Sequence, residues 1–336
     1  MKFIKIFIGV ISISSMLLSC KTDDESTQVY NYSYSKIISN LDQRISCVCF
    51  VNEQVGFTAT ANSQSMYKTI DGGKSWLLVN VNECPINTIF FINENVGFAA
   101  GGVSGSNIGS AFPGSMIYKT TDGGESWQKQ RISTNYSEQF SLYFVNDSVG
   151  FTVGLGYQAK TTNGGKSWIP FEFNYSGQMT KILFTDSNTG FAVGLFGNIF
   201  KSTDQGSIWN KMENKSIGHI YDLCFANKKI GYACGQGEIV KTIDGGNTWT
   251  TLTNSPSEMY FIHFVDENSG IAIGRGHYTG GDFGIWTNAI YKTTDGGETW
   301  QMEDNVDFGA VASFPTLEIG YSIVPNSTVK IEFKKY

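Results

Sequence analysis

A short phrase with an acidic or amide side chain at its centre recurs six times and supplies the first candidates for chemistry. Its fullest forms are YKTTDGGESW at 118–127 and YKTTDGGETW at 291–300. A carboxylate can act as a general acid or base. Repetition at equivalent positions, however, indicates a scaffold element rather than one catalytic site. The recurring residues are Asp71, Asp122, Asn163, Asp204, Asp244 and Asp295.

The residues around each Asp indicate a structural role. The carboxylate can accept hydrogen bonds from nearby backbone N–H groups and from the Thr hydroxyl, which closes a hairpin, and Asn163 can do much the same. The second Gly of the phrase permits the positive φ of such a turn. The Trp that ends the phrase can bury a large ring against a neighbouring unit. These tryptophans are Trp76, Trp127, Trp168, Trp209, Trp249 and Trp300.

The spacing of the copies predicts the fold. Successive central residues are separated by 51, 41, 41, 40 and 51 positions. A period near 40 with several strands per unit is typical of a β-propeller blade. A second motif, Phe-x5-Gly followed by an aliphatic or aromatic residue, occurs seven times and predicts seven blades. Its pairs are Phe50/Gly56, Phe91/Gly97, Phe144/Gly150, Phe184/Gly190, Phe225/Gly231, Phe264/Gly270 and Phe314/Gly320.

Each unit is expected to hold four short antiparallel strands. The innermost strand leads into the motif Phe, and the motif Gly before the second strand is expected to adopt a positive φ. The seventh unit ends after three strands, whereas QVYNYSYS at 28–35 alternates like a strand and belongs to no unit. We therefore expect an all-β, seven-bladed β-propeller of four-stranded blades, closed by an N-terminal strand that completes the last blade and removes an open edge.

The first residues predict export and lipidation. Lys2 and Lys5 precede an apolar run at 6–18 that is too short for a comfortable membrane span, and LLSC then ends at Cys20. This arrangement resembles the signal and lipobox of bacterial lipoproteins. We expect residues 1–19 to be a signal peptide, 20–27 a lipidated acidic tether and 28–336 the propeller. The expected location is the outer membrane through the lipid anchor, with periplasmic or outer-face display left open.

Composition excludes several partner and cofactor classes. Loss of Lys2 and Lys5 with the signal leaves 22 basic residues against 30 acidic ones, which argues against nucleic acid and against a basic membrane patch. No glycine loop opens a helix to bind phosphate and no His pair has metal spacing, so we expect no cofactor, no metal and a monomer. Cys224 and Cys234 are predicted on neighbouring strands, and a disulfide between them is left open.

The Phe-x5-Gly motif followed by YKTTDGG-S/T-W resembles the photosystem II stability/assembly factor family of plants and cyanobacteria. The phrase by itself resembles the Asp-box of sialidases and sortilin-type receptors. The family resemblance covers about residues 40–333 and implies a seven-bladed propeller that acts as a non-enzymatic assembly or binding scaffold. The arginine-rich partner-binding patch of that family is not matched, since this chain has three arginines, so no photosystem partner is implied.

Unequal loops indicate which rim binds a partner. The interval from the motif Gly to the box Asp is 15 residues in unit one and 13 in unit five. It is 25 in units two and six, because of insertions at 101–115 and 274–289. Both insertions are expected to overhang one face and frame a cleft, with the residues six before each motif Phe at its mouth. The candidate binding residues are Arg44, Glu138, His219, Glu258, Arg275, His277, Tyr278 and Trp286, and Phe112 and Phe308 are expected beside them.

Seven lysines recur at one position of the third strand. Their stems are expected to cover apolar surface while the ammonium heads reach water. They are Lys68, Lys119, Lys160, Lys201, Lys241, Lys292 and Lys330.

Two functions follow from these observations. The first is a non-enzymatic cell-envelope lipoprotein that recognises a protein or glycan partner on its loop-rich face. The alternative is a sialidase-like or other Asp-box glycoside hydrolase. In the sialidase-like version, Arg44, Arg131 and Arg275 grip a carboxylate and Glu138 or Glu258 assists a Tyr nucleophile. Against it, the chain has RIS at 44–46 and 131–133 where sialidases carry Arg-Ile-Pro.

Overall fold

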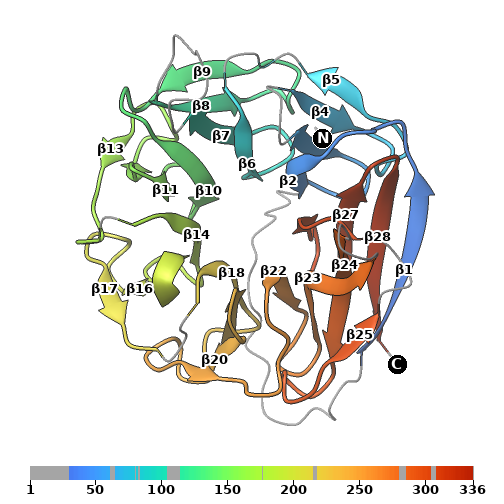
Figure 1. The fold of residues 1–336 in the computed structure, drawn as a ribbon. Helices are drawn as coiled ribbons and strands as arrows, with labels where there is room; N and C mark the ends of the chain where they lie inside the picture. Colours follow the sequence, from blue (N-terminus) through green and yellow to red (C-terminus); the bar gives the residue numbers. More distant parts are fainter. Residues whose placement is uncertain are drawn as a thin grey trace, which may run out of the picture.

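The chain folds into a ring of seven four-stranded antiparallel sheets, as the computed structural model shows (Figure 1). The structure describes residues 30–60, 65–79, 81, 84–103, 114–175, 177–214, 218–279, 285–303 and 308–335. The predicted seven-bladed propeller is confirmed. The expected signal peptide, the tether and Cys20 lie outside the described residues.

Each of the first six blades is a meander of four consecutive strands. Blade one holds β2 (Ile45–Phe50), β3 (Gly56–Thr60), β4 (Met66–Thr69) and β5 (Leu77–Val79), and blade two holds β6 (Ile86–Phe91), β7 (Gly97–Val103), β8 (Gly114–Thr120) and β9 (Gln128–Arg131). Blade three holds β10 (Glu138–Phe144), β11 (Gly150–Leu155), β12 (Ala159–Thr161) and β13 (Ile169–Pro170). Blade four holds β14 (Met179–Phe184), β15 (Gly190–Gly194), the short 3-10 turn η1 (Leu195–Gly197), β16 (Ile199–Ser202) and β17 (Asn210–Met212).

The remaining blades continue the same order. Blade five holds β18 (Ile220–Phe225), β19 (Gly231–Gly235), β20 (Val240–Thr242) and β21 (Thr250–Thr251), and blade six holds β22 (Met259–Phe264), β23 (Gly270–Thr279), β24 (Ile285–Thr293) and β25 (Gln301–Glu303). Blade seven holds β26 (Ala312–Ser313), β27 (Ile319–Val324), β28 (Ser327–Lys335) and, as its outer strand, β1 (Tyr30–Ile38). No helix in the described part of the chain is long and apolar enough to cross a bilayer.

The N-terminal strand closes the ring, as expected. β1 pairs antiparallel with β28, from Tyr30 opposite Lys335 to Ile38 opposite Ser327, and the two lie side by side at the right of Figure 1. The ring of Tyr32 lies 6.2 Å from that of Phe333. These contacts cover the apolar side of β28, so the last blade gains both an edge partner and a core.

Aromatic rings stack between neighbouring blades and explain the Phe-x5-Gly motif. Where the residue after a motif Gly is aromatic, it packs on the motif Phe of the next blade, as Phe57 does on Phe91 at 4.6 Å. The box Trp packs edge-on against both, with Trp127 6.0 Å from each of these two rings. This contact with the preceding blade confirms the expected role of the Trp.

The motif glycines serve a different purpose from the expected one. None of the seven has a positive φ, so the expectation that they permit a left-handed turn is wrong. The motif Phe ring lies directly over each of them instead: a Cβ added at Gly97 would lie 2.5 Å from the ring of Phe91. These glycines are required because a side chain would displace the stacked ring.

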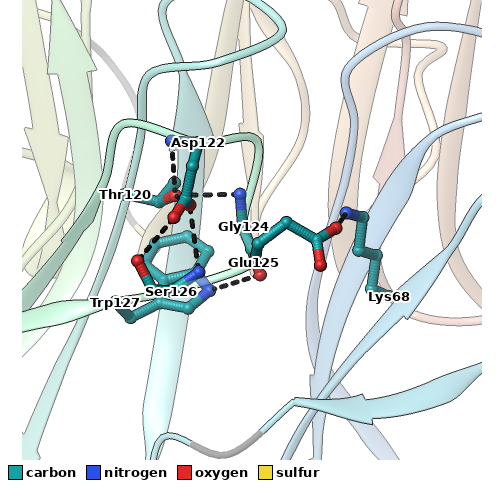
Figure 2. Close-up of polar contacts among 7 residues, drawn as sticks. All are labelled: Lys68, Thr120, Asp122, Gly124, Glu125, Ser126 and Trp127. Atoms are coloured by element: carbon teal, nitrogen blue, oxygen red, sulfur yellow. Dashed lines mark hydrogen bonds and ion pairs between the residues drawn. The ribbon is translucent and has the colours of Figure 1, made fainter.

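The box turns are closed as predicted, and Figure 2 shows the turn of blade two. The Thr120 hydroxyl donates to Asp122 Oδ1 at 2.7 Å. Ser126 donates its N–H to Oδ1 at 2.9 Å and its hydroxyl to Oδ2 at 2.5 Å. These hydrogen bonds hold the pKa of Asp122 below its usual range. Gly124 has φ 83° and donates its N–H to the Thr120 hydroxyl, which confirms the predicted positive φ of the box glycines.

Asn163 shows how an amide replaces the carboxylate. Its Oδ1 accepts from the Thr161 hydroxyl at 3.0 Å and from Ser167 N–H at 2.9 Å. Its Nδ2 donates to the Ser167 hydroxyl at 2.8 Å, so the direction of one hydrogen bond reverses. The same turn therefore forms without a charge, as expected.

Substitution at Asp295 is expected to separate turn closure from charge. Asp295→Ala removes acceptors for Thr293 and Thr299 and is expected to lower Tm by about 4 °C. Asp295→Asn is expected to change Tm little, because the amide can bond as Asn163 does. Differential scanning calorimetry of the two variants measures this, and equal losses in both would contradict the account.

The recurring lysines join neighbouring blades. Lys119 Nζ lies 5.5 Å from the ring centroid of Phe98 and donates to the carbonyl of Gly164 in the next box at 2.7 Å. Lys160 and Lys201 make the same bond to Gln205 and Gly245. The stems cover the rings as expected, and the partly exposed heads also bond to a backbone acceptor of the next blade, which the sequence did not predict.

His263 lies between blades six and seven. Its ring stacks on Phe314 at 3.8 Å, and Nε2 donates to the carbonyl of Leu317 at 2.8 Å. Burial lowers the pKa of His263 to about 4. The imidazole is therefore neutral at pH 7.

We expect stability to fall as the pH drops from 6.5 to 4. In this window the unfolded chain binds a proton on His263 that the folded chain does not, at a cost of at most about 3 kcal/mol. Asp244, whose pKa is held at about 2 by hydrogen bonds led by Thr248 N–H, stays ionised here. Urea unfolding of His263→Phe should show a shallower pH dependence over this window, and an unchanged slope would contradict the account.

The cysteines of the described residues are free, so the disulfide left open between Cys224 and Cys234 is not formed. Burial raises the pKa of both thiols well above the usual range.

Candidate functional site: an aromatic band on the loop face

The two rims of the ring differ in their connections. The turn between the first two strands of a blade bonds to the box turn of the same blade, as Gly123 N–H does to Asn95 O at 2.9 Å. We call this side the box rim. The connections between second and third strands lie at the opposite side, next to the start of the first strand: Gln236 N–H donates to His219 O at 2.8 Å. We call this side the loop face.

The two insertions lengthen hairpins on the loop face. The insertion in blade two extends the hairpin of β7 and β8, in which β7 is paired from Gly97 to Val103. The insertion in blade six extends the hairpin of β23 and β24, in which β23 is paired between Gly270 and Thr279. The hairpin tips, 104–113 with Phe112 and 280–284, lie outside the described residues, so the expected cleft between them stays a prediction.

The blade-six hairpin brings four of the candidate residues together. Arg275 forms an ion pair with Glu258, and its guanidinium lies 4.6 Å from the ring centroid of Trp286. The ring of Tyr278 lies 5.3 Å from that of Trp286. Trp286 and Tyr278 remain 51% and 46% exposed. An Arg held between a carboxylate and an indole is fixed in place while two aromatic faces stay open to a partner.

A second group of rings continues from blade four to blade six. Phe196, in η1, is 71% exposed, has a φ of 59°, and donates its N–H to His219 Nδ1 at 3.1 Å. The His219 ring lies 5.0 Å from Phe196 and 6.4 Å from Tyr221, and Tyr221 lies 6.2 Å from Tyr260. The rings thus form one chain across three blades.

Glu258 joins the two groups. It directly precedes β22, two residues before Tyr260, and its carbonyl accepts from Arg275 N–H at 3.1 Å while its carboxylate pairs with the Arg275 guanidinium. Burial raises the pKa of Tyr221, and the charges of Tyr260 and Glu258 raise it further. We refer to the whole surface as the aromatic band. Its members are Phe196, His219, Tyr221, Glu258, Tyr260, Arg275, Tyr278 and Trp286.

A β-bulge explains two members that sequence reasoning missed. The pairing of first and second strands skips one residue in each of blades one to six, four positions before the motif Phe. Bulges re-aim side chains and are enriched near functional sites. The skipped residues are Ser46, Asn87, Phe140, Thr180, Tyr221 and Tyr260. Tyr221 and Tyr260 stand four positions before their motif Phe, whereas the residues predicted at the mouth of the cleft stand six positions before it. Phe196 has no such signal, since it depends on the local turn.

Of the other candidates, His277 shares the blade-six hairpin with the band, whereas Arg44 and Glu138 belong to other blades. Arg44 is exposed directly before β2, and Glu138 begins β10. His277 lies in the blade-six hairpin, where its carbonyl accepts from the Thr287 hydroxyl at 3.1 Å. Phe308 is 2% exposed and packs on Tyr34 at 5.8 Å. Its expected place at the mouth is wrong, because the closing strand β1 draws it into the core.

Arg131 ends β9 and lines an open hollow of about 340 Å³ with residues 132–135 and Tyr157. Of the three arginines proposed to grip a carboxylate, Arg275 already pairs with Glu258. Within the described residues, no group of three or more His, Cys, Asp or Glu side chains is placed to hold a metal ion.

Comparison with known proteins confirms the resemblance found in the sequence. Residues 108–227 match the family described as photosynthesis system II assembly factor YCF48. A solved structure described as YCF48 bound to D1 peptide superposes with a TM-score of 0.66 and 17% identity, over 91% of this chain and 97% of that chain. YCF48 from Cyanidioschyzon merolae gives a TM-score of 0.65 and 14% identity, over 89% of this chain and 98% of that one.

An enzyme also shares the architecture. The GH74 enzyme from Niastella koreensis superposes with a TM-score of 0.66 and 16% identity, over 90% of this chain, which spans 53% of the enzyme's length. At these identities the superpositions show the fold alone. A search of curated proteins gives no significant match.

Proposed function

We propose that this chain is a non-enzymatic binding scaffold of the cell envelope that holds a segment of a partner protein along the aromatic band. The carrying observation is the continuous set of half-buried and exposed rings around the Arg275–Glu258 pair. Trp, Tyr and Arg dominate the binding energy of protein interfaces, and rigid rings lose little conformational entropy on contact. A propeller of similar fold has been solved with a bound D1 peptide, which supports the choice of a polypeptide.

The extent of the band supports a polypeptide over a small molecule, because small-molecule sites enclose most of a compact ligand. The band instead runs along the loop face from Phe196 to Tyr278. An extended segment suits such a track better than a compact ligand.

The envelope location is part of the same proposal. The sequence supports it through the basic head, the apolar run at 6–18 and the LLSC that ends at Cys20. In this proposal the lipid holds the scaffold at the membrane and the propeller presents the band to the partner.

Selection from a random peptide library on the immobilised propeller tests the binding role. Peptides that bind should lose at least about tenfold in affinity when Trp286 is changed to Ala, as expected for a central aromatic anchor. Ile169→Ala is the matched control, because Ile169 is 62% exposed on the outer strand β13, and it should leave affinity unchanged. Failure to select any peptide, or affinities indifferent to Trp286→Ala, Tyr278→Ala and Phe196→Ala alike, would overturn the proposal.

The glycosidase alternative is decided by turnover. A fluorogenic sialoside and xyloglucan serve as substrates for the purified chain. Hydrolysis of either that is lost in Arg275→Ala would replace the scaffold with an enzyme. Hydrolysis that survives this substitution would exclude the arginine grip in particular.

A further inference from the structure

The direction of β1 fixes the rim at which the N-terminal segment leaves the propeller. Lys330 of β28 pairs with Glu53 at 3.3 Å, and Glu53 lies in the turn between β2 and β3 at the box rim. Tyr30 is paired with Lys335, which is further along β28 in the same direction. At its other end β1 reaches the loop face, where Ser39 N–H donates to Asn326 O at 2.9 Å in the turn between β27 and β28. The chain before Tyr30 therefore leaves from the box rim.

The number of residues between Cys20 and β1 limits how the propeller can be oriented relative to the membrane. Ten residues, 20–29, precede Tyr30, and such a segment spans at most about 33–36 Å when fully extended. β1 has nine residues and crosses the sheet over about 30 Å. Turning the loop face toward the membrane would stretch the segment almost to its limit, whereas the opposite orientation needs no extension.

Charge at the exit favours the same orientation. Lys334 and Lys335 are exposed and pair with Asn31 and Tyr30 at the box-rim end of β1. Lysines near an anionic lipid surface contribute about 1 kcal/mol each. Lys228 and Lys229 are also exposed on this rim, in the turn of blade five, and Glu318 lies beside Phe333 at the blade-seven corner. The corner of blade seven is set apart because it combines a lysine pair with the exit of the N-terminal segment.

From this geometry we infer that the box rim of blade seven rests against the lipid surface and that the aromatic band faces away from it. The inference rests on the lipid anchor of the proposed function. It further defines the partner, because a segment that reaches the band must do so about 30 Å from the bilayer. Such a segment belongs to an extended or water-soluble region rather than to a chain that lies at the headgroups.

Energy transfer to labelled lipid tests the orientation on the full lipidated chain. The protein is reconstituted in phosphatidylethanolamine–phosphatidylglycerol vesicles with a headgroup acceptor, and a donor dye is attached through p-azidophenylalanine at Leu317 or at Ile38. Both side chains are exposed, at 54% and 82%. Leu317 lies between β26 and β27 at the box rim, and Ile38 ends β1 at the loop face. Thermal unfolding of each labelled protein confirms that the ring is intact.

Transfer from Leu317 should exceed transfer from Ile38 by at least about twofold, given the height of the blade. Equal transfer, or more from Ile38, would overturn the orientation while leaving the anchor and the binding role standing. Cys20→Ser protein should not float with the vesicles. If the wild-type chain also fails to float, the anchor itself is wrong and the orientation falls with it, whereas the peptide selection still decides the binding role.

Discussion

Removal of residues 30–38 is expected to destroy the cooperative fold or to lower Tm by at least about 10 °C. The deletion exposes the edge of β28 over its whole length and uncovers the cluster that holds Val329, Ile331 and Phe333. Burying each such side chain contributes about 1.5–3 kcal/mol, so the total loss exceeds what one ordinary substitution causes. Differential scanning calorimetry of the soluble protein, expressed without its signal, provides the measurement.

Two comparisons make the test specific. Deletion of residues 21–29 should leave Tm unchanged, because these residues precede β1. A synthetic peptide of residues 28–39 added to the protein that lacks 30–38 should raise Tm in a concentration-dependent way, since it binds the folded ring and not the unfolded chain. A ring as stable without β1 as with it would show that closure does not depend on the N-terminal strand.

Cys20→Ser is expected to abolish lipid attachment completely, because a thioether-linked lipid needs the cysteine thiol. In cells fed labelled palmitate, the wild-type chain should carry label and sediment with the membranes, and the variant should carry none. Cys234→Ser is the matched control and should keep the label, because that residue is buried in the propeller. A variant that still carries the label would refute lipidation at Cys20.

The fold could be predicted because six of the seven blades repeat the same local turn. A box such as Thr120–Trp127 closes its own turn with its own side chains, so it can be recognised from the local sequence alone. The closing strand could be predicted by counting strands, because blade seven lacked one and residues 28–35 belonged to no blade.

Contacts between blades could not be predicted in the same way. The purpose of Gly97 depends on where the ring of Phe91 lies, and the bond from Lys119 depends on a carbonyl in the next box. Phe308 was misplaced because its burial depends on β1, which is remote in sequence. Phe91 is six residues from Gly97, but the position of its ring depends on stacking against Phe57 of the preceding blade. The acceptor of Lys119 also lies in another blade.

The candidate site was predicted in part for the same reason. The insertion at 274–289 lengthens the interval between motif Gly and box Asp in unit six, and this difference in the sequence pointed to Arg275, Tyr278 and Trp286. The link from that hairpin to Tyr221 and Tyr260 arises from bulges in strands β18 and β22. A bulge turns one residue out of the regular alternation, so a pattern of period two does not reveal it.

Site-specific photo-crosslinking in living cells tests the central claim most directly. p-Benzoylphenylalanine is placed at Trp286 in the aromatic band and, as a control, at Ile169 on the outer strand of blade three. We predict a discrete adduct of defined mass from position 286, reduced when Phe196 is also changed to Ala, and no adduct from position 169. Adducts from position 169 alone, or adducts from position 286 that no other change in the band affects, would contradict a partner bound along this surface.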